Sequence, residues 1–128
     1  MSKLIEERIE RFKTVADQLR GAKAYYREDW DVYYFDLTGK MFGLMSPEPK
    51  EDAIITLKGL PEHNEILREQ YSDVSPGYHT NKTHWNSIKL ETKQLSNPEI
   101  EKLILQSYQL VYEKLPKKTR NQIESRGG

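Results

Sequence analysis

The amino-acid sequence predicts an α+β fold, a two-layer sandwich in which an antiparallel sheet has its helices packed on one face. Two observations predict it. Apolar residues recur at helical spacing near both ends of the chain, and runs of strand-forming residues follow one another between them with few intervening helices. Neighbouring strands of this kind pair in antiparallel fashion, and helices then cover one face of the sheet.

Length and composition indicate one domain. A chain of 128 residues is the size of an ordinary domain, and we expect residues 1–126 to form it, with 127–128 as a frayed tail. No run approaches the ~18 consecutive apolar residues of a spanning helix, so we expect no membrane contact. Charges from Lys3 onward predict that there is no signal peptide. The chain has no cysteine, which excludes disulfides and thiolate sites and favours a cytoplasmic location.

The first element is predicted to be a helix. One face of a 3.6-residue period carries Ile5, Ile9, Phe12, Ala16 and Leu19. Ser2 is placed to cap its start, and Gly21 stands where a glycine commonly follows a helix end.

Three strands are predicted next. Residues 32–37 and 41–45 are rich in aromatic and aliphatic side chains, and the turn Thr38-Gly39-Lys40 between them indicates a hairpin. The segment 46–49 breaks this pattern with two prolines. Residues 53–57 form the third strand, which ends at Lys58-Gly59.

A surface helix and a further strand are predicted after Gly59. Pro61 can take the first helical position, and the helix that follows is mostly charged apart from Ile66, Leu67 and Tyr71. Residues 74–77 end it. A polar and aromatic segment, residues 78–85, then leads into a strand at 86–90.

The last long helix begins near Asn97. Asn97 is the predicted cap, Pro98 takes the first position and Glu99 favours the positive end of the dipole. Its apolar face carries Ile100, Leu103, Ile104, Ser107, Tyr108, Val111 and Leu115. Pro116 starts a short final turn over 117–122. The predicted order is therefore α-β-β-β-α-β(β)-α.

Charge is distributed unevenly along a chain that is neutral overall. Residues 1–77 carry 11 Lys and Arg against 15 Asp and Glu, whereas residues 78–128 carry 9 against 5. The excess of positive charge in the second half indicates a polyanionic partner.

The segment 78–85 is the candidate site. In a nucleic-acid-binding loop, Lys82 would contact a phosphate, His79, Asn81 and His84 would form hydrogen bonds, and Tyr78 and Trp85 would stack on bases. The structural alternative is that Trp85 anchors the core, Asn81 caps a turn and His84 is half-buried.

A basic cluster follows the last long helix. Lys117, Lys118 and Arg120 can bind phosphates, like the loop lysine. The alternative is that they complement the helix dipole and keep the surface solvated.

Enzyme and metal motifs are missing from the sequence. The three histidines, His63, His79 and His84, have no metal-ligand spacing. G-x-S-x-G, G-x-G-x-x-G and Walker motifs are also absent. We therefore expect no catalytic activity, no metal and no cofactor.

Three segments carry a family resemblance. They are Asn81-Lys82-Thr83-His84-Trp85, then Ser107-Tyr108-Gln109-Leu110-Val111, then Leu115-Pro116-Lys117-Lys118-Thr119-Arg120. Together they resemble the N-K-x-H-W, S-Y-x-L-V and L-P-K-K-x-R pattern of the MmcQ/YjbR family. The resemblance implies a two-layer fold of order α-β(3)-α-β(2)-α. It also implies DNA binding, since members are described as gripping duplex DNA with two loop-like wings, and no catalytic activity is established for them.

Another protein is the alternative partner. The resemblance also implies a fold like that of secretion chaperones, which bind polypeptides on an exposed face. Tyr25, Tyr26 and Trp30 are candidate surface aromatics of the kind enriched in interfaces, although core packing would explain them equally. The leading expectation is that the basic residues of the second half gather beside the exposed 78–85 loop and bind DNA.

Overall fold

The computed structural model describes residues 3–78 and 80–126. The predicted cap Ser2, the predicted site residue His79 and the tail 127–128 lie outside these residues. The elements are α1 (Lys3–Asp17), β1 (Ala22–Arg27), β2 (Val32–Leu37), β3 (Lys40–Met45), β4 (Ile54–Lys58), α2 (Pro61–Gln70), β5 (Val74–Pro76), β6 (Trp85–Lys89), α3 (Asn97–Glu113) and α4 (Lys117–Arg126). Within the described residues, no helix combines the length and the apolar character needed to cross a membrane.

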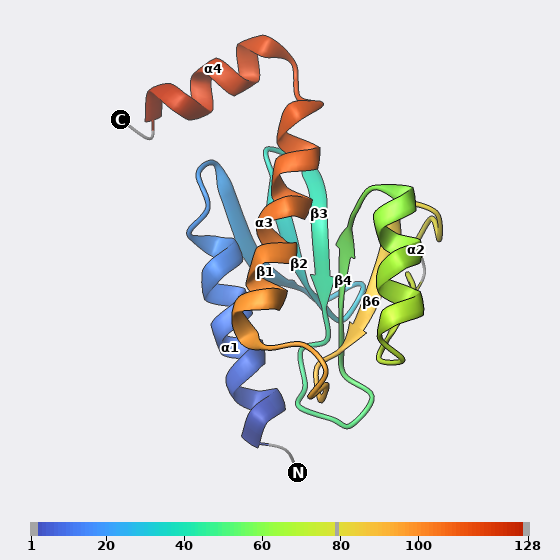
Figure 1. The fold of residues 1–128 in the computed structure, drawn as a ribbon. Helices are drawn as coiled ribbons and strands as arrows, with labels where there is room; N and C mark the ends of the chain where they lie inside the picture. The colour runs from blue at the N-terminus through green and yellow to red at the C-terminus, as the bar shows by residue number, and fades with distance from the viewer. Residues whose placement is uncertain (1–2, 79, 127–128) are drawn as a thin grey trace.

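The strands form one antiparallel sheet of six strands in the order β1-β2-β3-β4-β6-β5. Helices α1 and α3 lie side by side on one face of it, α1 against β1 and β2 and α3 against β2, β3 and β4 (Figure 1). Helix α2 lies beside β5 at the other edge. The predicted α+β sandwich with its main helices on one face is confirmed.

The core fills the space between the sheet and the helices. The apolar face predicted for the first helix is the one observed, with Ile5, Ile9, Phe12 and Ala16 buried. The Ser107 hydroxyl of α3 donates to the carbonyl of Phe42 at 2.5 Å and accepts from the Lys58 amide at 2.9 Å. A buried polar side chain thereby ties α3 to both β3 and β4.

Three predicted elements differ from the structure. Residues 22–27 form an additional strand, which is stabilised by pairing with β2 through register contacts such as Tyr26 with Tyr33. Residues 74–76, predicted only to end the second helix, pair with β6 as β5. The predicted short final turn is the ten-residue helix α4, whose buried Ile123 packs against Gly21.

The cap of α3 is Ser96 rather than the predicted Asn97. The Ser96 hydroxyl accepts from the Glu99 amide, and the Glu99 carboxylate accepts from the Ser96 amide, so the two residues form a capping box. The Asn97 side chain instead accepts a hydrogen bond from Arg8.

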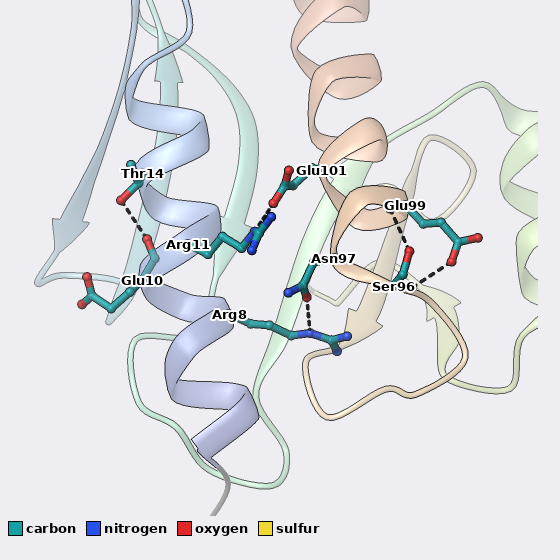
Figure 2. A network of polar contacts seen from close by, with 8 residues as sticks. All are labelled: Arg8, Glu10, Arg11, Thr14, Ser96, Asn97, Glu99 and Glu101. Atoms are coloured by element: carbon teal, nitrogen blue, oxygen red, sulfur yellow. Dashed lines mark hydrogen bonds and ion pairs between the residues drawn. The ribbon is translucent and has the colours of Figure 1, made fainter.

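A buried arginine joins α1 to the connection between β6 and α3 (Figure 2). Arg8 is 5% exposed, and its guanidinium donates to the Asn97 Oδ1 at 2.8 Å. It also donates to three backbone carbonyls, those of Leu90, Thr92 and Leu95, at 2.7–3.0 Å. Burial lowers the pKa of Arg8, yet a guanidinium stays charged in proteins, so these oxygens solvate a permanent positive charge.

A second arginine holds the segment that precedes β6. Arg68 of α2 donates to the Asn86 Oδ1 at 2.6 Å and to the carbonyls of Lys82 and Trp85. Asn64 of the same helix donates to the carbonyls of Gly59 and Thr83. Helix α2 therefore fixes the path of residues 82–86.

We predict that Arg8→Met lowers the free energy of unfolding by about 3 kcal/mol or more, since each buried carbonyl left without a donor costs roughly 1–3 kcal/mol. Urea denaturation measures the change. The matched control is Arg11→Met on the same helix, which removes a partly exposed ion pair with Glu101 and should cost no more than ~1 kcal/mol. Equal losses in the two variants would contradict the structural role of Arg8.

We predict that Arg68→Ala loosens residues 80–86 without unfolding the sheet. Hydrogen exchange should become faster at the amides of this segment and stay unchanged in β2 and β3, because local opening costs less once the three acceptors lose their donor. Glu69→Ala, at the exposed neighbouring position, is the control. Faster hydrogen exchange throughout the sheet would contradict a role of Arg68 that is confined to residues 80–86.

Candidate functional site

The sheet face that α1 and α3 leave uncovered carries a continuous row of side chains. The pairing register aligns one residue from each strand: Tyr25, Tyr34, Leu44, Thr56, Ser87 and Ser75. The next residues along these strands, such as Phe35 and Ile55, are buried in the core. Alternation along the strands therefore separates the core from a second face that is partly open to solvent.

A groove with a volume of about 680 Å³ runs along this open face. Its floor combines apolar Val32, Leu44 and Ile54 with the hydroxyls of Thr56 and Ser87. The two hydroxyl oxygens are 2.7 Å apart and bond to each other. This mixture of apolar floor and few polar groups is typical of ligand sites.

The turn between β1 and β2 forms one wall of the groove. Trp30 is 53% exposed, and the Arg27 guanidinium lies 3.8 Å from its ring centroid. Arg27 also pairs with Asp29 at 2.6 Å, while the Tyr34 ring meets the indole edge-on. These contacts hold the exposed indole in a defined position.

Carboxylates lie beside this wall. Asp31 and Asp52, from the β1–β2 turn and the β3–β4 connection, both line the groove. The Asp31 Oδ1 accepts from the Tyr26 hydroxyl at 2.7 Å, and this hydrogen bond raises the pKa of Tyr26. The groove is therefore acidic at its Trp30 wall.

The segment 77–84 forms the opposite wall. Tyr78 and Lys82 line the groove there, and the Lys82 ammonium donates to the Gly77 carbonyl at 3.0 Å. Gly77 is required at its position, since a Cβ there would come within 2.1 Å of the Thr80 hydroxyl. Asn81 caps a turn, its Oδ1 accepting from the amides of Thr83 and His84 at 2.9 and 3.2 Å.

A separate group of cations lies where β4 ends and α3 passes into α4. We call this group, Lys58, Lys114, Lys117, Lys118 and Arg120, the basic end. Burial and the nearby positive charge of Lys114 both lower the pKa of Lys58. Among the described residues, none of the five forms an ion pair with a carboxylate.

The structure divides the predicted site residues between these two surfaces. Tyr78 and Lys82 line the groove, whereas Lys117, Lys118 and Arg120 belong to the basic end. Helix α4 runs from α3 toward the turn before β1, so it lies away from the loop beside β5 and β6 (Figure 1). Lys58 is the register partner of Trp85, so the basic end reaches the last residue of the 78–85 segment. That Lys117, Lys118 and Arg120 join Lys82 in one DNA-binding surface stays a prediction.

The remaining predicted residues have more structural roles. Asn81 is the turn cap of the alternative interpretation, and Trp85 is half-buried at the start of β6. His84 is exposed rather than half-buried, and its carbonyl accepts from the Gly59 amide at 2.9 Å, next to Lys58. Tyr25, Tyr26 and Trp30 are 40%, 48% and 53% exposed, which excludes core packing for them.

Sequence reasoning missed Asp52, Thr56 and Ser87 in the groove and Lys58 at the basic end. The alternation of apolar and polar residues in 54–58 and 85–89 could have indicated a half-exposed face. Among the described residues, no group of three or more histidines and carboxylates is placed to hold a metal ion.

Comparison with known proteins identifies relatives. The YjbR family model matches residues 18–110. A protein named YjbR from Escherichia coli strain K12 is 33% identical over 100 residues, which cover 78% of this chain and 83% of that protein. A protein named YbdF from E. coli O157:H7 is 32% identical over 95 residues, which cover 74% of this chain and 75% of that one.

Solved structures share the fold. The crystal structure of a Deinococcus radiodurans protein with a DUF419 domain matches with a TM-score of 0.81 and 25% identity, over 91% of this chain and 87% of that one. A Pseudomonas syringae protein matches with a TM-score of 0.66 and 26% identity, over 86% and 98%. The family expected from the three sequence motifs is therefore confirmed, and the chain belongs to the YjbR family.

Proposed function

We propose that this protein binds the nucleic-acid backbone through its basic end. The observation that carries the proposal is the position of Lys114, Lys117, Lys118 and Arg120 at the junction of α3 and α4, with Lys58 near Lys114. None of the five has a carboxylate partner among the described residues. Closely spaced cations repel one another, and the pKa of Lys58 is lowered by burial and, after that, by the positive charge of Lys114. A row of phosphates would relieve it.

The position of Lys117 and Lys118 in α4 supports the proposal. The sequence suggested that these residues complement the negative end of the preceding helix. They follow the C-terminal end of α3 and also occupy the first turn of α4, which contains no acidic residue. Cations are unfavourable at the positive end of a helix dipole, so the dipole of α4 itself does not favour these lysines. A phosphate bound at this helix start would be favoured by the dipole and by the lysines.

The chain's neutral net charge is compatible with this function because the opposite charges are separated. The acidic groove residues Asp31 and Asp52 lie in connections at the far end of β2 and β4 from the basic end. A polyanion docked at the α3–α4 junction would meet local positive charge, which acts over about one Debye length, roughly 10 Å at 0.1 M salt.

We predict salt-dependent binding of duplex DNA, measured by fluorescence anisotropy from about 50 mM salt upward. The log–log slope should be about −0.9 for each phosphate contacted. The triple variant Lys114→Ala/Lys117→Ala/Lys118→Ala should weaken binding at low salt and flatten the slope by about 0.9 for each lysine that contacts a phosphate.

The control carries the same change in net charge at the other end of the strands. Lys50, Lys89 and Lys93 are exposed there, and their replacement by alanine should leave the slope unchanged. No binding by the wild type at low salt, or equal losses in both triple variants, would refute the proposal.

We also predict that affinity falls as the pH rises through the alkaline range. The pKa of Lys58 is already lowered in the free protein, and a bound phosphate raises it by favouring the charged form. Binding therefore takes up a proton and weakens once the pH exceeds the lowered pKa. Titrations from about pH 7 to about pH 10 measure this change, and Lys58→Arg should move the loss of affinity to higher pH, because arginine stays charged throughout. Identical pH profiles for the two proteins would contradict a role for Lys58.

A further inference from the structure

We infer that the groove on the open sheet face binds a single unpaired nucleotide, with its base at the Trp30 wall and its phosphate at Lys82. This inference deepens the proposed nucleic-acid function by naming an unpaired base as a ligand. The groove residues are not part of the basic end. An experiment can therefore contradict nucleotide binding in the groove without contradicting backbone binding at the basic end.

The size and lining of the groove fit a nucleotide. Its volume of about 680 Å³ lies within the ~300–1,000 Å³ of small-molecule sites. Aromatic side chains stand on both walls, Trp30 on one and Tyr78 on the other, 53% and 61% exposed. Exposed aromatic rings over an open antiparallel sheet provide stacking platforms for unpaired bases.

The indole is held in place before any ligand arrives. The Arg27 guanidinium covers part of Trp30 at 3.8 Å from the ring centroid, and Asp29 fixes that guanidinium by an ion pair. A stacking surface that is already ordered loses little conformational entropy on binding. Stacking on such a ring is worth about 1–3 kcal/mol per base.

The carboxylates define which base fits. Asp31 and Asp52 are hydrogen-bond acceptors on the groove lining. Cytosine, adenine and guanine carry amino groups that donate to a carboxylate, whereas thymine has no amino group. The same negative charges repel a phosphate from this wall. We therefore expect the base of the nucleotide, and not its phosphate, to lie at the Trp30 wall.

Lys82 supplies the complementary charge on the other wall. One of its ammonium hydrogens is used by the Gly77 carbonyl at 3.0 Å, and an ammonium has three donors. The exposed Ser75 also lines the groove, whereas the buried Ser87 Oγ is bonded to the Tyr78 amide and to the Thr56 hydroxyl. A phosphate attached to the bound base would meet this cation while its base lies against Trp30. The shared chemistry is that of a nucleotide, whether free or within a single strand.

Tryptophan fluorescence tests the inference directly. The chain has two tryptophans, so Trp85→Phe leaves Trp30 as the only reporter. Titration with oligodeoxycytidylate should quench Trp30 to saturation, and oligodeoxythymidylate should bind on the order of fivefold or more weakly, because one good base contact is worth ~1–3 kcal/mol. If Trp85→Phe is unstable, the two indole N–H resonances of the wild type report the same binding separately.

Matched variants assign the contacts. Asp52→Ala should remove the preference for cytosine, whereas Glu51→Ala, at an exposed neighbour that does not line the groove, should keep it. Lys82→Met should weaken cytidine monophosphate several-fold and leave cytidine unchanged. Tighter binding of the oligonucleotide than of the monophosphate would identify a single strand as the source, and the reverse would identify a free nucleotide.

Three results would overturn the inference. One is no quenching by any nucleotide. Another is equal quenching by cytosine and thymine ligands that Asp52→Ala does not change. The third is quenching by oligolysine alone, which would identify the groove as a site for a cationic peptide. Suppose that duplex binding depends on Lys114 and Lys117 while the Trp30 fluorescence does not change. That result would support the proposed function and contradict only the nucleotide site in the groove.

Discussion

A buried positive charge, which has no carboxylate partner in the part of the chain that the structure describes, fixes how the two main helices lie on the sheet. Arg8 is surrounded by the Asn97 side chain and the carbonyls of residues 90, 92 and 95. A guanidinium cannot lose its proton to escape the cost of burial, so the connection between β6 and α3 must keep its oxygens around it. The start of α3 is thereby held beside α1, and both helices cover the same face of the sheet (Figure 2).

The position of α1 and α3 on one face of the sheet leaves the other face available for a surface groove. Because α1 and α3 share a side, a row of side chains from Tyr25 to Ser75 stays outside the core. The groove forms there between two connections, one carrying Trp30 and the other Lys82. The basic end arises where α3 leaves the sheet and the chain turns at Pro116, and Lys58 connects it to the start of β6. A neutral chain therefore presents two surfaces of different charge.

The sequence predicts the parts of this fold that local patterns control. The burial of Ile5, Ile9 and Phe12 follows from a helical period, and the hairpin around Gly39 follows from its turn residues. Strand β1 has few β-branched residues, and its pairing with β2 supplies what its propensity lacks. Helix α4 is almost wholly polar and depends on a contact between Ile123 and Gly21, about a hundred positions away in the sequence.

The candidate sites were also predictable only in part, because they combine residues that are distant in the sequence. Tyr78 and Lys82 lie in one short segment, which draws attention by its composition alone. Their groove partners Trp30 and Asp52 come from two other connections, and only the strand order places them together. The basic character of residues 117–120 is evident from the sequence, whereas the direction of α4, which carries them, depends on the contact of Ile123 with Gly21 and is encoded by no local pattern.

The single apolar anchor of α4 has a consequence for how this helix behaves. Ile123 is its one buried hydrophobic side chain among the described residues, helped by a hydrogen bond between Tyr112 and Glu124. Exposing one isoleucine costs about 1.5–3 kcal/mol, well below the ~5–15 kcal/mol of global unfolding. Local opening of α4 therefore costs less free energy than unfolding of the sandwich. Lys117 and Lys118 therefore belong to the helix whose contact with the sandwich is the least costly to break, and a partner that binds them can shift this helix without disturbing the sheet.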